Sequence, residues 1–194
     1  CYSEIYFGEE PPLGALEVAS KAGRHGFERL IVLTSLSKRS NVPGLRSGFV
    51  AGDADIIRRF LLYRTYHGSA MSPTVQHASL AAWNDEDHVR ANRALYGEKF
   101  ARVTPMLSAV LGVALPDAGF YLWADVSPTK HGDDDIAFAQ GLLAQYNVTV
   151  LPGSLRARTA QGHNPGSGRI RMALVAGVED CLEAARRIVS YTES

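Results

Sequence analysis

The chain has 194 residues, of which 46% are hydrophobic and 21% are charged, and its formal net charge is zero. This composition is typical of a soluble globular protein with a real core, and a neutral chain has no bulk field that would draw it to nucleic acid or to a membrane surface. No apolar run approaches the roughly 20 residues that a membrane-spanning helix needs. The two cysteines, Cys1 and Cys181, lie far apart without metal-ligand spacing, which predicts a reduced, cytoplasmic setting and no metal site.

The first part of the chain reads as short strands and helices. Its opening stretch, "CYSEIYFG", is typical of a strand end that runs into a loop, and because the chain begins with Cys rather than Met we expect it to be a piece of a longer one. A polar turn separates two short apolar runs, and two helices follow, the first beginning at Asp53 and the second with Pro73 in its first turn. The predicted elements are strands at 28–34 and 46–51 and helices at 53–64 and 72–83. One side of the first helix is apolar through Ile56, Ile57, Phe60 and Leu61.

A long helix is predicted next, from about Asn84 to Leu111, with Asn84 as its N-cap and a kink expected at Pro105. Its apolar face consists of Tyr96, Phe100, Val103, Leu107 and Val110. Beyond Gly112 the texture changes to shorter alternating elements, with strands predicted at 119–126, 148–152 and 168–175 and helices at 134–146 and 178–192. The acidic run at 133–135 is typical of a helix start. This change in the pattern of predicted elements predicts two domains, at residues 1–90 and 91–194.

The turn "TSLSKRSNVPGLRSG", residues 34–48, collects hydroxyls and cations directly after a predicted strand. A phosphate dianion prefers hydroxyl donors and a planar guanidinium, which Ser35, Ser37 and Arg46 could supply at the end of an α/β strand. Lys38 lies between them, and a lysine shielded from water beside other cations is a suitable nucleophile. A nucleophilic lysine next to a phosphate cradle outlines a pyridoxal phosphate site. An ordinary solvated loop is the plainer alternative, and a nucleotide site is disfavoured because no Gly-x-Gly-x-x-Gly or Gly-Lys-Ser/Thr element follows the strand.

The block "SLSKRSNVPGLRSGF" resembles the Ser-x-Ser-Lys…Gly-x-Arg-x-Gly block of the fold-type I pyridoxal phosphate-dependent aminotransferases of class I/II, and the spacing from Lys38 to Arg46 fits that family. The stretches "CYSEIYF", "GFYLWADV" and "GRIRMALV" extend the resemblance over essentially the whole chain. The resemblance implies an α/β fold, in which residues 1–90 are the C-terminal part of the large cofactor-binding domain. Residues 91–194 are then a long linking helix and the small α+β C-terminal domain.

The resemblance also implies how the cofactor is held. Lys38 forms the Schiff base with pyridoxal 5'-phosphate and then moves the substrate's α-proton. Arg46 and Ser35 hold the phosphate, with Ser37 as a further candidate whose hydroxyl could instead stabilise the turn. Tyr2 hydrogen-bonds the phenolic oxygen of the cofactor.

The implied substrate contact is Arg171, which grips the α-carboxylate of an amino-acid or 2-oxo-acid substrate. Its neighbour Arg169 points to the same side of the strand, because residues two apart on a strand share a face. Where the family leads us to expect an aromatic residue after "PGS", this chain has Leu155 followed by Arg156. Arg156 and Arg158 could bind the distal carboxylates of a succinylated substrate, although solvated loop cations are the simpler reading.

Three stretches, "SLSKRSNVPGLRSGFVAGD", "YRTYHGSAMSPTVQ" and "VLPGS…GHNPG…RIRMALV", most resemble the members that act on N-succinyl-LL-2,6-diaminopimelate with 2-oxoglutarate in lysine biosynthesis. A homodimer is implied for the full-length enzyme, in which Ser72 could reach the neighbouring subunit's phosphate. The family's aspartate partner of the pyridine nitrogen would precede residue 1, so we expect this piece alone to be inactive. Two alternatives stay open. One is another class I aminotransferase, for acetylornithine, aspartate or an aromatic amino acid. The other is a non-catalytic aminotransferase-like effector domain of a transcription regulator.

Overall fold

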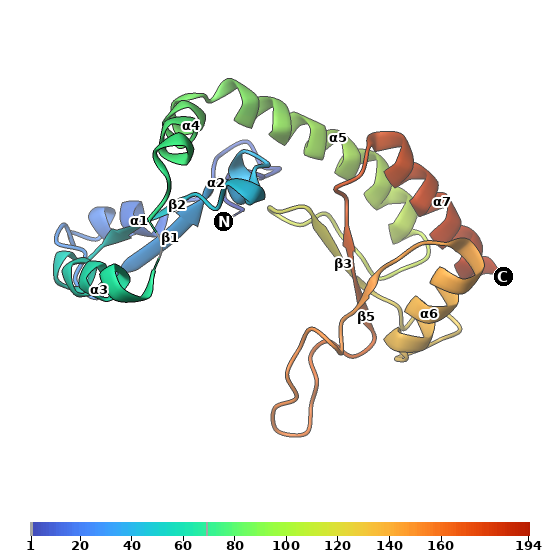
Figure 1. Cartoon of the computed structure of the whole chain (residues 1–194). Helices are drawn as coiled ribbons and strands as arrows, with labels where there is room; N and C mark the ends of the chain where they lie inside the picture. The colour runs from blue at the N-terminus through green and yellow to red at the C-terminus, as the bar shows by residue number, and fades with distance from the viewer. Residues whose placement is uncertain (1, 69) are drawn as a thin grey trace. The chain divides into compact units, whose positions relative to one another are not determined.

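The computed structural model describes residues 2–68 and 70–194, so Cys1 lies outside the described residues. The chain divides into two compact units, Cys1–Arg93 and Ala94–Ser194, which are described separately below (Figure 1). Both mix helices with strands, which confirms the α/β class predicted from the sequence. In the described part of the chain, no helix combines the length and the apolar character needed to cross a bilayer.

A pair of antiparallel strands forms the centre of the first unit. Ile31 lies opposite Gly52 and Ser35 opposite Gly48, so the two strands pair along their whole length, and the end of β1 lies beside the start of β2. The elements of this unit are α1 (Ala15–Lys21), β1 (Ile31–Ser35), α2 (Leu36–Arg39), a 3₁₀ helix (Pro43–Leu45), β2 (Gly48–Gly52), α3 (Ala54–His67), α4 (Pro73–Asn84) and the start of α5 (Asp87–Ser108). Both predicted strands are confirmed, although β1 begins three residues later than expected because Arg29 adopts a left-handed conformation with φ 61°. The predicted strand end around Tyr2 is instead a turn, in which the Ile5 N–H donates to the Tyr2 carbonyl.

Helix α3 begins where the sequence predicts. The Asp53 carboxylate caps it by accepting hydrogen bonds from the backbone N–H groups of Asp55 and Ile56. The same carboxylate accepts from the N–H of Arg29 at 2.7 Å. These backbone hydrogen bonds, that from Arg29 first, hold the pKa of Asp53 below its usual value. The cap therefore also ties the entry of β1 to the exit of β2.

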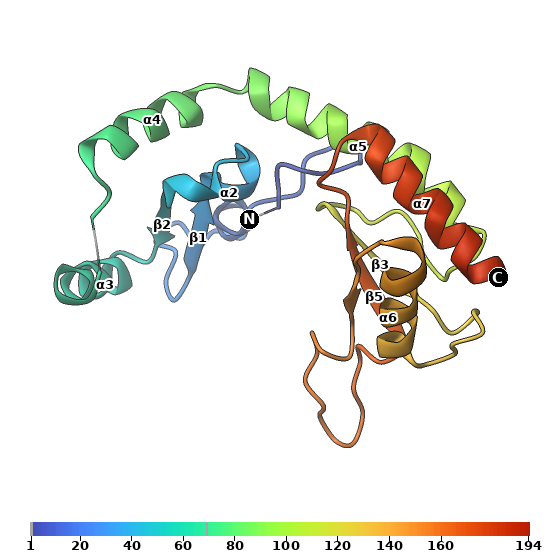
Figure 2. The same cartoon turned by 45° about the vertical axis from the view of Figure 1, so that its right-hand side comes forward.

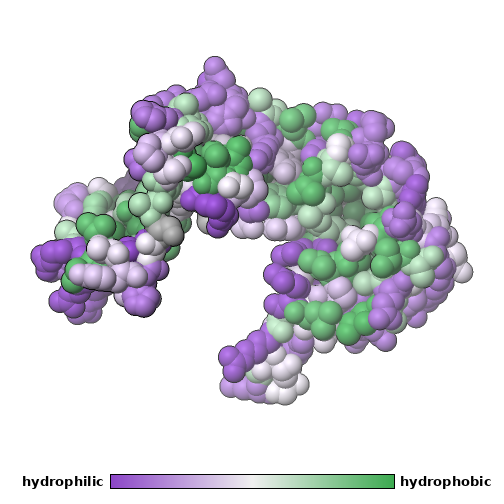
Figure 3. Space-filling view, in the orientation of Figure 1, coloured by the Kyte–Doolittle hydropathy of each residue, from purple (hydrophilic) through white to green (hydrophobic). Residues whose placement is uncertain are grey.

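The apolar side of α3 is exposed rather than buried, and no residue described in this helix is buried. Leu61 is 66% exposed and Tyr66 79% exposed, and on the strands Leu33 is 64% exposed. Green apolar patches accordingly appear in the space-filling view of the unit that holds α3 (Figure 3).

Helix α4 begins at Pro73, and the Ser72 hydroxyl accepts the N–H of Val75 as its N-cap. The predicted cap Asn84 is wrong, because Asn84 is the last residue of α4 and α5 begins only at Asp87. The Asp85 carboxylate takes over the capping contact and accepts the N–H of Asp87. The sequence-based prediction thus assigned the last residue of α4 to the start of the following helix.

The second unit contains a three-stranded antiparallel sheet in the order β3-β5-β4, with α6 and α7 lying beside one another next to it (Figures 1 and 2). Its elements after α5 are β3 (Tyr121–Asp125), α6 (Asp135–Tyr146), β4 (Leu151–Pro152), β5 (Arg169–Ala173) and α7 (Val178–Glu193). Both predicted helices are confirmed, as are the strands around 121–125 and 169–173. Of the strand predicted at 148–152 only its last two residues pair.

One face of this sheet is buried with the helices, and the other faces outward. The buried side chains of the sheet are Leu122, Ala124, Ile170 and Met172, and those of the helices include Phe100, Val103, Leu107, Phe138, Leu142, Leu182 and Ile188. The apolar face predicted for the long helix is therefore confirmed except at Val110, which follows the end of α5 and is half-buried. The alternation leaves Tyr121, Trp123, Asp125, Arg169 and Arg171 on the outer face.

Shortening a side chain of this core tests whether the core lies between the sheet and the helices. Leu122 is fully buried, so Leu122→Ala should lower the free energy of unfolding of the second unit by about 2–5 kcal/mol. The matched control Leu115→Ala removes the same atoms from a side chain that is 52% exposed, and should change it by less than about 0.5 kcal/mol. Urea unfolding followed by circular dichroism measures both values. Equal losses in the two variants would contradict this core.

Candidate functional site

The end of β1 carries the first predicted site residues. Ser35 is both the last residue of β1 and the N-cap of α2, and its hydroxyl accepts the N–H of Ser37 at 3.3 Å. Serine favours this position because its short side chain reaches the unpaired N–H groups of a helix start. Lys38 follows on α2 and is half-buried. The end of β1, the N-cap of α2 and Lys38 therefore follow one another within a single short stretch of chain.

Arg46 lies two residues before the return strand β2. It adopts a left-handed conformation, with φ 52°, at the end of the 3₁₀ helix, and its guanidinium donates to the Pro43 carbonyl at 2.8 Å. The next residue, Ser47, is buried, and its hydroxyl accepts that of Ser79 on α4 at 2.7 Å. Arg46 itself is exposed. Its backbone therefore turns the chain back to β2 while the side chain stays at the surface.

A cavity of about 650 Å³ brings several of these residues together. Its walls include the predicted phosphate ligands Ser35, Ser37 and Arg46, together with Phe49 of β2. Hydroxyls and a guanidinium around one cavity suit the phosphate end of pyridoxal phosphate. The residues present therefore fit the anionic part of that cofactor.

Two predicted cofactor residues lie outside the walls of this cavity. Lys38 is on α2, one residue after the cavity-lining Ser37. Tyr2 lies in the N-terminal turn and is half-buried. The cavity thus brings together three of the five predicted cofactor residues, and the roles of all five stay predictions.

Sequence reasoning missed Arg64, whose side of α3 forms another wall of the same cavity. It lies seven residues, or about two turns, after Ile57 and shares a helix face with Phe60 and Leu61. All four residues line the cavity. The signal was available, because positions 57, 60, 61 and 64 follow helical spacing. A second guanidinium adds to the positive character of the cavity, which favours an anionic ligand.

The predicted substrate arginine lies in the second unit, on the outer face of the sheet. Arg171 on β5 lies opposite Trp123 on β3, and its guanidinium carbon is 4.4 Å from the centroid of the Tyr121 ring. Stacking uses the flat face of a guanidinium and leaves its N–H edge pointing outward in the plane. That edge is the part of an arginine that binds a carboxylate in two places.

Its neighbour Arg169 has a different environment. The guanidinium of Arg169 is 3.8 Å from the Asp125 carboxylate, with both side chains about one-third exposed. Hydrogen bonds from the Ser127 hydroxyl and N–H, in first place, and the positive charge of Arg169 lower the pKa of Asp125. Asp125 is therefore ionised at neutral pH and stays a partner for Arg169. This difference favours Arg171 over Arg169 as a carboxylate-binding group.

The loop after β4 is anchored at its base but exposes its cations. The N–H of Ser154 donates to the buried Asp135 carboxylate at 2.8 Å, and the Asn164 amide donates to the Ser154 carbonyl. Arg156 and Arg158 are exposed. In the described ranges 2–68 and 70–194, no cluster of three or more His, Cys, Asp or Glu side chains could hold a metal ion.

Comparison with known proteins places these features in a family. The family described as Aminotransferase class I and II matches residues 1–188. The chain therefore belongs to the class I and II aminotransferases, which use pyridoxal phosphate. This agrees with the resemblance seen in the sequence.

Among individual relatives, a probable aminotransferase of Mycobacterium tuberculosis is 34% identical and matches 97% of this chain and 42% of its own length. An LL-diaminopimelate aminotransferase of Syntrophobacter fumaroxidans is 33% identical, over 96% of this chain and 45% of the relative. A crystal structure of an aminotransferase from Neisseria meningitidis is 57% identical with a TM-score of 0.92, over 99% of this chain and 48% of that one. A probable N-succinyldiaminopimelate aminotransferase from Thermus thermophilus is 29% identical with a TM-score of 0.81. The chain spans about half the length of the relatives it matches.

The close approach of β1 and β2 is open to a direct test. A Cβ atom at Gly48 would lie 2.4 Å from the Thr34 carbonyl oxygen, whereas one at Gly44 would meet nothing within 4 Å. Gly48→Ala should therefore force the strands apart and lower the free energy of unfolding by about 1–3 kcal/mol. Gly44→Ala is the matched control and should leave it nearly unchanged. Thermal unfolding of the two variants measures this, and equal stability would contradict the tight strand pairing.

Proposed function

We propose that the protein to which these residues belong is a pyridoxal phosphate-dependent aminotransferase that transfers an amino group between an amino acid and a 2-oxo acid. The observation that carries this proposal is the cavity at the end of β1, which Ser35, Ser37 and Arg46 line and where Ser37 directly precedes Lys38 in the chain. When bound, the cofactor supplies an aldehyde that condenses with amines and a ring that withdraws electrons from the reacting carbon.

In this proposal each residue has one task. Ser35, Ser37 and Arg46 bind the phosphate and so fix the position of the cofactor ring. The Lys38 amine holds the cofactor covalently and moves the α-proton of the substrate. Arg171 binds the substrate's α-carboxylate and orients it.

For the substrate we propose N-succinyl-LL-2,6-diaminopimelate as amino donor and 2-oxoglutarate as acceptor. The support is the sequence similarity to a probable N-succinyldiaminopimelate aminotransferase, next to relatives that act by name on LL-diaminopimelate. The two donors differ by a succinyl group, which carries a carboxylate in place of a cationic amine. Relative rates on these donors and on aspartate decide between them, and a preference for aspartate would contradict this choice.

Lys38 provides the main test of the proposed chemistry. In the full-length protein, Lys38→Ala should abolish the visible absorbance of the lysine-bound cofactor and lower turnover by more than about 100-fold, because the amine performs both covalent attachment and proton transfer. The control Lys21→Ala changes an exposed lysine paired with Glu17 and should alter neither. An unchanged spectrum in Lys38→Ala would remove the assignment.

The two arginines of β5 provide a matched pair for substrate binding. Arg171→Lys keeps the charge but loses the two-pronged contact, so the KM for 2-oxoglutarate should rise about tenfold or more. Arg169→Lys, which alters the arginine paired with Asp125, should change KM by less than about threefold. Steady-state kinetics with the two variants measure this. A larger effect at Arg169 would reverse the assignment.

A further inference from the structure

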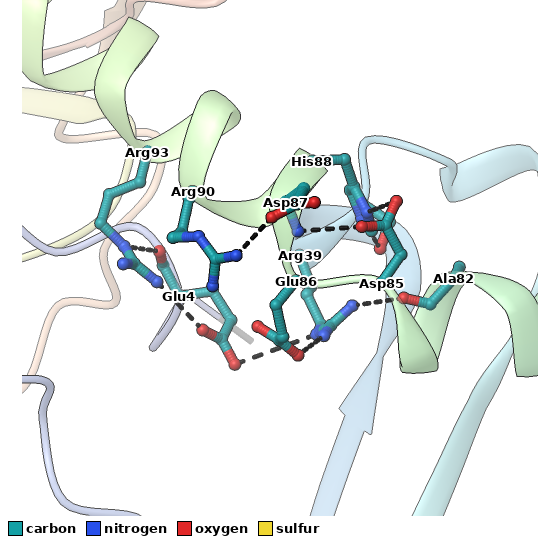
Figure 4. Close-up of polar contacts among 10 residues, drawn as sticks. Glu4, Arg39, Ala82, Asp85, Glu86, Asp87, His88, Arg90 and Arg93 are labelled. Atoms are coloured by element: carbon teal, nitrogen blue, oxygen red, sulfur yellow. Dashed lines mark hydrogen bonds and ion pairs between the residues drawn. The ribbon is translucent and has the colours of Figure 1, made fainter.

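The residue after Lys38 is a buried arginine. Arg39 is only 4% exposed, and its guanidinium donates to the Ala82 carbonyl at 2.7 Å and to the Glu86 carboxylate (Figure 4). Its Nε lies 4.0 Å from the Glu4 carboxylate, and its Cζ lies 4.9 Å from the centroid of the Trp83 ring. One guanidinium thus contacts a helix end, two carboxylates and an aromatic ring.

These partners come from segments far apart in the sequence. Ala82 is in the last turn of α4, where backbone carbonyls lack partners within the helix and a cation is favourable. Glu86 lies between α4 and α5, and Glu4 lies in the turn that begins at Tyr2. Arg39 therefore joins α2 both to the α4–α5 junction and to the N-terminal turn.

The N-terminal turn is held from a second side. Arg93 on α5 donates from its Nε to the Glu4 carbonyl at 2.9 Å, and its Nη2 lies 3.4 Å from the Glu4 carboxylate. Its guanidinium carbon is also 4.1 Å from the centroid of the Tyr6 ring. Glu4 thus bridges two arginines, and its segment is fixed relative to α2 and α5 together.

The two residues after Arg39 are anchored to α5. The Ser40 hydroxyl lies 2.8 Å from Nε2 of His88, and the Asn41 amide donates to the buried Asn92 side chain at 2.7 Å. The other ring nitrogen of His88 lies 3.0 Å from the Asp85 carboxylate, and this hydrogen bond, in first place, lowers the pKa of Asp85. The three residues directly after Lys38 are therefore all anchored, Arg39 at the α4–α5 junction and the next two residues on α5.

The short helix α2 divides into an anchored side and an open side. Leu36 is fully buried and Arg39 nearly so, and residues three apart on a helix share a face. Ser37 and Lys38 between them are half-buried, and Ser37 lines the cavity. The anchoring contacts thus act on one side of α2 and leave the other side for the cofactor.

We propose that Arg39 is a positioning residue for Lys38. By holding α2 against the α4–α5 junction it fixes where the Lys38 amine lies, and through Glu4 it fixes the Tyr2 turn to the same anchor. This proposal rests on the proposed function of Lys38 as the cofactor lysine. Its physical basis is that Arg39 adjoins Lys38 in the chain, so a small tilt of α2 displaces the amine, and misplacement of about 1 Å can cost about 100-fold in rate.

The test uses the full-length protein with cofactor bound. Arg39→Met removes the charge and all donors, and Arg39→Lys keeps the charge but loses the planar fork. The control Arg90→Met removes an exposed arginine whose partner is Asp87 on the same helix. The visible band of the lysine-bound cofactor is titrated against pH, kcat is measured, and melting temperatures are recorded.

We expect Arg39→Met to shift the midpoint of that titration by at least about half a pH unit and to lower kcat at least tenfold, both at temperatures well below melting. Arg39→Lys should keep the fold and show a smaller shift of the same sign. Arg90→Met should match the wild type in both readouts.

The outcomes separate the two proposals. If the wild type shows no lysine-bound cofactor, the proposed function fails and this inference fails with it. If the wild type shows the band and Arg39→Met melts earlier but keeps the wild-type midpoint and kcat, Arg39 is structural only and the inference is overturned alone. If Arg39→Met does not fold, Arg39→Lys decides, and wild-type values of midpoint and kcat in that variant overturn the inference.

Discussion

The pairing of Ser35 with Gly48 is the constraint on which the candidate site depends. Because these residues are opposite one another, the end of β1 and the start of β2 meet at the same edge, and residues 36–47 must leave and return there. Thr34 leaves no room for a Cβ atom at Gly48, so the close approach depends on glycine. The hydroxyls of Ser35 and Ser37 near the start of this segment and the guanidinium of Arg46 near its end consequently line one cavity, although Ser35 and Arg46 are eleven positions apart.

A buried guanidinium on the far side of α2 is hard to explain by stability alone. Removing a charge from water is costly, and replacing a buried ion pair with apolar groups is often neutral or stabilising. Arg39 recovers that cost only in part from Glu86, whose side chain is 54% exposed. What it achieves in addition is geometric, because its donors point in fixed directions to α4 and to the α4–α5 junction. The burial of this charge is therefore better explained by its effect on the orientation of α2 than by any contribution of Arg39 to the free energy of unfolding.

Local patterns predicted most elements, whereas contacts between distant segments were out of reach. Helix α3 was predicted from its cap Asp53 and from the helical spacing of its apolar residues, since both signals lie within one turn or one face. Asn84 was misplaced because a good N-cap residue is also acceptable at a helix end, and only the tertiary course of α4 distinguishes the two. The burial of Arg39 was not predicted, because it depends on Glu4 and Glu86, which local spacing does not connect to it. The chemistry of the turn itself suggested a nucleophilic Lys38 and a phosphate-binding Arg46, whereas the predicted roles of Tyr2 and Arg171 came from the resemblance to a family.

The outer face of β3 and β5 shows how two neighbouring arginines acquire different uses. Asp125 is held ionised by Ser127 and Arg169, so above its usual pKa of 3.8 it neutralises Arg169. Arg171, two residues along, rests instead on the Tyr121 ring, which attracts the flat face of the cation without consuming its N–H edge. If this face binds substrate as proposed, a carboxylate meets a compensated charge at Arg169 and an aligned fork at Arg171. The difference between two identical side chains then follows from their neighbours on β3, which are Asp125 directly opposite Arg169 and Tyr121 diagonally across from Arg171, and not from their own chemistry.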